Sequence, residues 1–254
     1  MNSRCNCERG SNLYIDIYVG DLAEALKSTT QLHKRCVFVS TLVNEYRVAV
    51  SMVFWLSVPE PTLRRILRDA GFSEAPAPPP TISLVPGVEV VLGPPRKLLA
   101  LYRSVKISWD SAKFLLIFEG VVRDVVEALK AVEPSFSKHG YPLSKVCHYY
   151  EANFVAQPLD IDSFVSKLRE KVGIELKIGN EVLMPFSISF SNAEEPISRE
   201  HFYKWLHIII NPDVNAPQKR VFVQIIKRDT DFHSILKFVE GIGSVLELLR
   251  KFFT

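Results

Sequence analysis

Apolar and polar residues alternate along much of this chain, and the alternation is interrupted by shorter stretches with helical spacing. The stretch at 46–57 predicts a long strand, and the apolar residues three or four apart within 59–71 predict an amphipathic helix. Residues 121–132 predict a second helix, which Pro134 should end because proline disfavours the helical conformation before it. Between these helices, strands are expected over 88–92, 97–109 and 113–119.

The same order of elements recurs in the second half of the chain. Residues 146–156 predict a strand, residues 161–172 a helix, and the dipeptide Gly179-Asn180 a two-residue hairpin turn. A closing helix is expected from 231 to 252. Further strands are expected over 174–178, 182–190, 202–210 and 220–227. An order of elements that occurs twice indicates an internal duplication.

Three further segments complete the expected organisation. Residues 13–45 predict an N-terminal strand, helix and strand, the last forming a hairpin with 46–57, and residues 1–12 precede them as a tail. The proline-rich stretch 73–80 should be an exposed connection that cannot pair in a sheet. Residues 135–145 lack periodicity and predict a linker between the two repeats. The repeats then span 46–134 and 146–254.

Composition indicates a globular protein without a strong overall field. The 254 residues are 47% hydrophobic, and 31 basic against 28 acidic residues give a net charge of +3, so any surface for polyanions must be local. The longest apolar runs are shorter than the roughly 20 residues of a membrane span, and the N-terminus lacks the apolar core of a secretory signal. We therefore expect no membrane partner and a cytoplasmic location. Scarce glutamine beside abundant Lys, Arg and Glu favours a thermophilic source.

The densest set of basic residues lies in the first half of the chain. Arg64, Arg65 and Arg68 fall on the polar side of the helix expected over 59–71. If other basic residues of this half share their face, the set could bind phosphate groups with a salt-dependent affinity. A solvated helix face and strand ends are the competing interpretation. The other basic residues are Arg47, Arg96, Lys97, Arg103 and Lys106.

Aromatic residues crowd the strands of the second half. Because successive side chains of a strand point to opposite faces, one set must form the core and the other must lie on the open face. Aromatic rings on an open face could stack on nucleic-acid bases or wedge between them. The crowded residues are Tyr149, Tyr150, Phe154, Phe186, Phe190, Phe202, Tyr203 and Trp205.

Catalytic and metal-binding motifs are missing from the sequence, which contains no nucleophile elbow, phosphate-binding loop or zinc-protease helix. His201 and His207 share one face of an expected strand, and His148 could approach them, but the sequence fixes no carboxylate nearby. Cys5 and Cys7 are separated by a single residue, which is not the spacing of a zinc site. We therefore expect no enzyme activity, no metal and no cofactor.

Two segments of the second half resemble the TATA-box-binding protein family. YEANFVAQPLDIDSF (150–164) is similar to the strand that enters a helix in that family, with Asn153 at the place of a base-contacting asparagine. SILKFVEGIGSVLELLRKF (234–252) is similar to its closing helix. The resemblance implies an α+β saddle over about 46–254, which is an internally duplicated, curved antiparallel sheet with helices packed on one face. The N-terminal β-α-β extension has no counterpart, and Ala49 or a neighbour stands where a second asparagine is expected.

A second interpretation divides the chain differently. The elements from residue 13 to residue 92 also read as strand, helix, strand, strand, helix and strand, which is the order of a ferredoxin-like unit. The chain would then consist of tandem ferredoxin-like units, with a boundary near Pro94 and the second half as a separate module.

These observations predict a non-enzymatic binding protein. DNA or RNA is the expected ligand, held by basic residues and by aromatic residues of the sheet. The alternative is a protein partner or a small ligand bound by an apolar sheet face or pocket. The expected nucleic-acid-binding residues are Arg47, Arg64, Arg65, Arg68, Arg103, Lys106, Asn153, Phe186 and Phe190.

Overall fold

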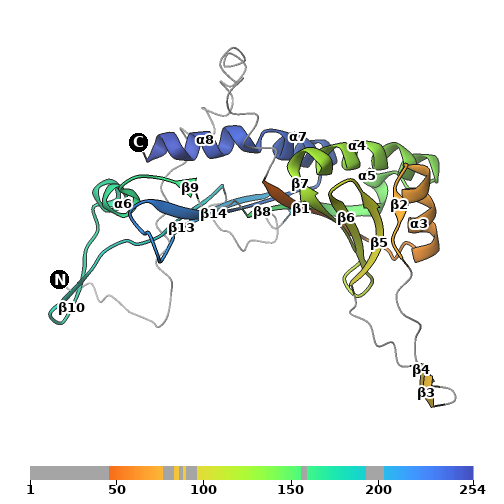
Figure 1. Ribbon diagram of the computed structural model, residues 1–254, viewed down its shortest axis with the longest axis horizontal. Coiled ribbons are helices and arrows are strands. Elements are labelled where there is room, and N and C mark those ends of the chain that lie inside the picture. Colours follow the sequence, from red (N-terminus) through yellow and green to blue (C-terminus); the bar gives the residue numbers. More distant parts are fainter. Residues whose placement is uncertain are drawn as a thin grey trace, which may run out of the picture.

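The computed structural model describes residues 46–76, 83–85, 88–89, 96–155, 159–192 and 203–253, with backbone alone for the two shortest ranges. The tail and extension expected over 1–45 lie outside these residues. The described part is an α+β structure built on one open, antiparallel sheet, which Figure 1 shows as a curved layer beneath the helices. No helix in it is long and apolar enough to cross a membrane.

The main sheet combines strands from both halves of the chain. The first half supplies β1 (Arg47–Phe54), β2 (Ser73–Glu74), β5 (Arg96–Tyr102), β6 (Val105–Asp110) and β7 (Leu115–Val121). The second half supplies β8 (Cys147–Val155), β9 (Leu159–Asp160), β12 (Ile188–Ser191), β13 (Trp205–Pro212) and β14 (Arg220–Asp229). Their order is β12-β13-β14-β8-β1-β7-β6-β5-β2, with β9 paired to β14. The central pair is β1 and β8. Outward from this pair the first half continues with β7, β6 and β5, and the second half with β14, β13 and β12, so both halves follow in reverse order of sequence.

Strand β1 is paired along both of its edges. On one side Val50 lies opposite Phe118 of β7, and on the other it lies opposite Ala152 of β8. The hairpin expected between β1 and residues 36–42 is therefore wrong, because no edge of β1 is left for it. The division into tandem ferredoxin-like units is also wrong, since the two halves share one continuous sheet.

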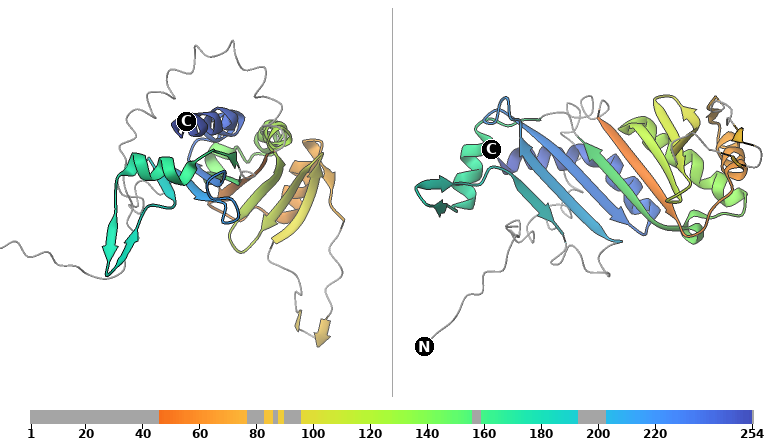
Figure 2. Two further views of the ribbon diagram at one scale, coloured as in Figure 1. Left: turned by 60° about the vertical axis from the view of Figure 1, so that its left-hand side comes forward. Right: turned by 90° about the horizontal axis from the view of Figure 1, so that it is seen from below.

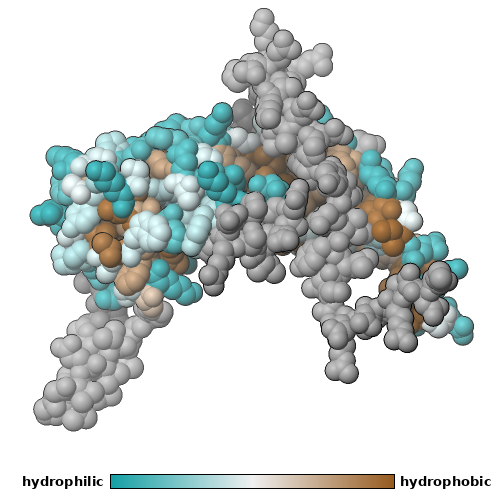
Figure 3. Space-filling view, turned by 180° about the vertical axis from the view of Figure 1, so that it is seen from behind, coloured by the Kyte–Doolittle hydropathy of each residue, from teal (hydrophilic) through white to brown (hydrophobic). Residues whose placement is uncertain are grey.

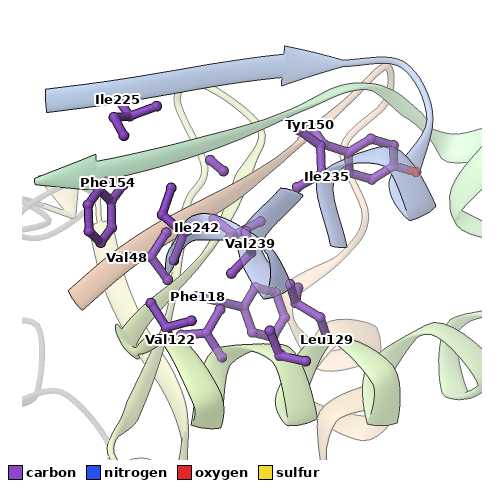
Figure 4. Packing of buried hydrophobic residues seen from close by; sticks show 14 of the residues in the cluster. Val48, Phe118, Val122, Leu129, Tyr150, Phe154, Ile225, Ile235, Val239 and Ile242 are labelled. Carbon is purple, nitrogen blue, oxygen red and sulfur yellow. The ribbon is translucent and has the colours of Figure 1, made fainter. Parts of the chain in front are cut away.

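Helices cover one face of this sheet. Those of the first half are α3 (Glu60–Asp69), α4 (Val122–Lys138) and α5 (Leu143–Val146), and those of the second are α6 (Phe164–Val172), α7 (Phe232–Glu240) and α8 (Ile242–Phe252). The view from below in Figure 2 shows the strands in front and α4, α7 and α8 behind them. Val50 and Met52 of β1 are fully buried beneath these helices. Figure 4 shows Leu129 of α4 and Val239 of α7 close to Phe118 of β7, where both halves meet in one core.

Helix α4 runs past the proline that was expected to end it. Pro134 lies inside the helix, which continues to Lys138. The lost proline N–H costs one hydrogen bond, but Ser135 and Phe136 beyond it are both buried and their packing holds the last turn in place. The segment 135–145, expected as a linker without regular structure, contains the end of α4 and most of α5.

Two strand boundaries also differ from expectation. The single strand expected over 97–109 is a hairpin of β5 and β6, because Arg103 turns the chain at a left-handed φ of 50°. Ser73 and Glu74 pair with β5 although they begin the proline-rich stretch, so the expectation that this stretch cannot pair is wrong for them. Local turn residues such as Gly and Asn are absent at Arg103-Ser104, which explains why the pattern concealed this turn.

The turn expected at Gly179-Asn180 is confirmed. It joins β10 (Leu176–Ile178) to β11 (Glu181–Leu183), and Gly179 has a φ of 62°, which glycine adopts at no steric cost. A further two-stranded sheet joins β3 (Ser83–Val85) and β4 (Val88–Glu89). The closing helix expected over 231–252 is two helices, because the chain breaks at Gly241.

Candidate functional site

The face of the main sheet opposite the helices, here called the open face, carries the residues that alternate with the core set. Its centre is formed by Ala49, Ser51 and Val53 of β1, which lie opposite Asn153, Glu151 and Tyr149 of β8. All six side chains are partly buried rather than fully exposed. Figure 2 looks onto this face in its view from below. A ligand on it would therefore meet the small side chains of β1 beside the polar side chains and the phenol of β8.

Aromatic rings line one end of the open face. The indole of Trp55 stacks on the imidazole of His148, with ring centroids 3.6 Å apart and planes 8° from parallel. His148 lies 4.2 Å from the ring of Tyr203, and Tyr203 lies 5.6 Å from the ring of Tyr149. Trp55 remains 59% exposed, so one face of the indole is open to solvent. We call Trp55, His148, Tyr149, Tyr203 and Trp205 the aromatic row.

A guanidinium joins the two sides of the aromatic row. Arg228 of β14 lies over the ring of Tyr149 at 5.6 Å and over the ring of Trp205 at 5.2 Å from its central carbon. Its Nε also donates to the carboxylate of Glu151, which lies directly opposite on β8. The indole N–H of Trp205 donates to the hydroxyl of Ser191 at 3.1 Å. These contacts fix planar groups side by side across four strands.

Antiparallel register explains why these residues meet. One end of the sheet holds the end of β1, the starts of β8 and β13 and the end of β14, because neighbouring strands run in opposite directions. The β1–β8 register shifts between Val53 and Phe54, which leaves His148 as the extra residue of a bulge. This bulge places His148 beneath Trp55, whose backbone N–H donates to the carbonyl of Val146 at 3.0 Å.

Burial shifts the pKa of two ionisable groups on this face, Tyr149 and His207. Loss of hydration raises the pKa of Tyr149 above its ordinary value, although the charge of Arg228 opposes the change, so the phenol stays neutral. Loss of hydration also lowers the pKa of His207, which hydrogen-bonds to Ser189. His207 has no carboxylate partner within the described part of the chain.

The first half places its open-face cations around one acid. Glu119 of β7 accepts from Arg47 at 3.5 Å and from Arg96 at 3.2 Å, and Lys106 lies opposite it on β6. Arg47 and Lys106 were both expected at a nucleic-acid surface, and the structure brings them together here. Their charges are partly balanced by Glu119, so this part of the open face is only weakly basic.

The other expected cations do not reach the open face. Arg64 donates to Glu60 at 2.9 Å and to the carbonyl of Leu99 at 3.3 Å, while Arg68 bonds to Glu74. Burial alone would raise the pKa of Glu60, but its bonds to Arg64 and Lys97 outweigh burial and lower the pKa. Glu60 and Arg64 lie four residues apart in the sequence, which is the spacing of an ion pair on one side of a helix.

Arg103 is likewise held on the side of the helices. It forms an ion pair with Glu127 of α4, lies 3.8 Å from Asp124, and covers the ring of Tyr102. Arg65 is exposed on α3. The structure therefore separates the arginines of α3 and Arg103 from Arg47 and Lys106, the two expected cations that lie on the open face.

Asn153 and the two phenylalanines complete the expected set. Asn153 lies at the centre of the open face between Ala49 and Ile226. Its Oδ1 is buried and has no hydrogen-bond partner among the residues that the structure describes. Phe186 follows β11 and is 47% exposed. Phe190 lies on the covered face, where its ring contacts Phe252 of α8 at 5.6 Å. Phe190 is thus a packing residue in this structure.

Sequence reasoning missed Trp55 and Arg228 as site residues. Trp55 directly follows β1, between Phe54 and Leu56, and continues the alternation of Ser51 and Val53. Arg228 alternates with the core positions of β14, so the strand period is the signal that could have indicated its place on the open face. No cluster of His, Cys, Asp or Glu that could hold a metal occurs among the described residues. No family model matches the chain, and a search of curated proteins likewise gives no match.

Proposed function

We propose that this chain is a non-enzymatic binding protein whose ligand docks on the open face of the sheet, and that the ligand is single-stranded nucleic acid. The aromatic row with Arg228 carries the proposal. Unpaired bases stack on planar side chains of a sheet face that no helix covers. Each stacked base contributes about 1–3 kcal/mol to the free energy of binding. A duplex keeps its bases stacked on one another, so the row favours a single strand.

Asn153 supports the same surface. A buried amide oxygen without a partner costs about 1–3 kcal/mol in the free protein, and a donor on a ligand would remove that cost. Base edges and sugar hydroxyls supply such donors. The similarity of residues 150–164 to the TATA-box-binding protein family adds that Asn153 stands at the place of a base-contacting residue.

We also infer that the two halves are copies of one unit. The strand order supports this. From the centre outward the first half has β1, β7, β6 and β5, and the second half has β8, β14, β13 and β12. In both halves the first strand along the chain is therefore central, and the later strands follow it in reverse order of sequence. Each half also has one helix after its first strand and a helical segment at its end. The copies have diverged in chemistry, since the aromatic row belongs mainly to the second half.

The test is a titration with single-stranded and duplex oligonucleotides, followed by tryptophan fluorescence. Trp55 and Trp205 lie in the row, whereas Trp109 is 2% exposed in the core and should not respond. We expect quenching by single strands, and a loss of affinity on the order of tenfold in Trp205→Ala and in Trp55→Ala. Arg65→Ala is the matched control, because this exposed cation lies away from the open face.

The salt dependence adds a second readout. Arg47, Arg96 and Arg228 are already paired with Glu119 or Glu151, so few counterions should be released on binding. We expect a shallow slope of about one to two in a plot of log affinity against log salt. Equal affinity of wild type and a Trp55→Ala/Trp205→Ala double variant, both folded by thermal melt, would contradict the proposal.

A protein partner is the second candidate for the same face. The paired charges favour it, because a partly buried surface with balanced ion pairs also suits a protein interface. Absence of binding to every oligonucleotide, single-stranded and duplex, would transfer the proposal to this candidate.

A further inference from the structure

One hairpin stands outside the main sheet and exposes apolar side chains. All six strand residues of β10 and β11 are exposed, and Leu176, Ile178 and Val182 are 56%, 58% and 50% exposed. Figure 1 shows the hairpin projecting away from the sheet, and Figure 3 shows hydrophobic side chains at the surface of that end of the molecule. Single exposed apolar residues are ordinary, but a hairpin in which four of the six strand residues are apolar and exposed is not.

A two-stranded hairpin alone is marginally stable in water and gains stability when a third strand pairs with it. Among the described residues, β10 pairs with β11 alone, so its outer edge has no strand on it. In a two-residue hairpin the pair that flanks the turn is hydrogen-bonded, here Ile178 with Glu181. Successive residues of a strand direct their N–H and C=O groups to opposite sides. Because those of Ile178 point to β11, those of Lys177 and Glu175 point to the outer edge.

We propose that the outer edge of β10 pairs with the same edge of a second copy of this chain. In an antiparallel pairing centred on Leu176, Glu175 of each copy lies opposite Lys177 of the other. Both pairs are of opposite charge, and both use the outward backbone groups. Ile174 then lies opposite Ile178 of the second copy, and the two Leu176 side chains lie side by side.

The alternative registers lack this complementarity. Centring the pairing on residue 175 or 177 places Glu opposite Glu or Lys opposite Lys, and like charges directly opposite destabilise a strand pair. A shift by one residue turns the outward backbone groups away from each other. The pairing centred on Leu176 is also isologous, so it closes as a dimer with two-fold symmetry and does not extend into a fibre.

The charges of Glu175 and Lys177 give a test that is specific for this register. We expect wild type to form dimers in sedimentation equilibrium, and Lys177→Glu and Glu175→Lys each to weaken dimerisation on the order of tenfold or more. Mixing the two variants should restore association, because each Glu then meets a Lys in the mixed dimer. The double variant Glu175→Lys/Lys177→Glu should dimerise like wild type for the same reason.

Glu181→Lys is the matched control, since it makes the same charge change on the same hairpin but lies on β11, away from the paired edge. It should leave the dimer intact. A monomeric wild type at every concentration tested, or two single variants that fail to associate when mixed, would overturn the proposal. The proposal does not depend on the ligand of the open face, whose titration is read separately by tryptophan fluorescence.

Discussion

The hydroxyl of Ser135 donates a hydrogen bond to the backbone carbonyl of Ile66, with 2.7 Å between the two oxygens. Ser135 lies one residue beyond Pro134 in α4, and Ile66 lies in the middle of α3. Both side chains are buried. This bond ties the two helices of the first half together at the point where proline weakens α4.

We expect Ser135→Ala to lower the free energy of unfolding by about 1 kcal/mol, which is the usual net worth of one buried hydrogen bond. The loss should not be larger, because the carbonyl of Ile66 also accepts from the N–H of Ala70 at 3.0 Å. Chemical denaturation measures the change. Ser137→Ala, two residues along the same helix and exposed, is the control, and equal effects of the two substitutions would refute this role of Ser135.

The closing helices pack on the sheet through a buried apolar stripe, in which Leu246 of α8 is 4% exposed. Removing a large side chain from a packed core leaves a cavity, so Leu246→Ala should lower stability by about 2–5 kcal/mol. Ser244→Ala on the exposed side of the same helix should change little. A melting temperature of Leu246→Ala within error of wild type would show that this stripe serves an interface instead of the core.

Gly120 of β7 leaves room for the turn between β5 and β6. A Cβ added at Gly120 would lie 3.0 Å from the Cα of Val105 and 3.1 Å from the carbonyl oxygen of Ser104, both backbone atoms. We expect Gly120→Ala to lower stability by about 1–3 kcal/mol and Gly120→Val to lower it further. Stability that is insensitive to side-chain size at this position would contradict the close approach.

Cys147 should be unreactive while the protein is folded. Burial raises the pKa of its thiol to about 12, and only the thiolate attacks alkylating reagents. In a variant with Cys5, Cys7 and Cys36 changed to serine, iodoacetamide at about pH 8 should label Cys147 only after denaturation. Rapid labelling of the folded variant would show that the thiol is accessible and ionised.

The same thiol makes stability depend on pH. The folded pKa lies above the unfolded value of about 8.5, so the neutral buried thiol contributes stability that is fully present below that pH. The contribution is lost as the pH rises toward about 12, because the unfolded chain gains the thiolate first. Cys147→Ala should flatten the alkaline part of a plot of melting temperature against pH.

Local patterns predicted most elements of the fold, and non-local pairing decided the rest. The turn at Gly179-Asn180 followed from residue type alone, whereas the turn at Arg103 uses a residue that rarely adopts positive φ. Pro134 was expected to end α4, but packing of Phe136 overrode its local preference. Which strands flank β1 depends on segments far along the chain, and no local pattern reports that.

The candidate site was predictable in part for the same reason. The strand period predicted that one set of the aromatic residues forms the core and the other lies on the open face, but it did not show that Trp55 would stack on His148 from another strand. Several of the basic residues are paired with acids, and apart from Glu60 and Glu74 these acids come from distant elements such as β7 and α4. Charge counted along a sequence does not reveal which ion pairs cancel it.

Because β1 and β8 pair at the centre of the sheet, each half of the chain is needed to complete the structure of the other. If either half unfolded alone, the other would expose a full-length strand edge at the middle of the sheet, together with core residues that α4 and α7 bury jointly. Partial unfolding is therefore costly, and the sheet should lose its structure in one cooperative step. During synthesis the first half is made before the second, so the edge of β1 that pairs with β8 has exposed N–H and C=O groups until β8 has left the ribosome.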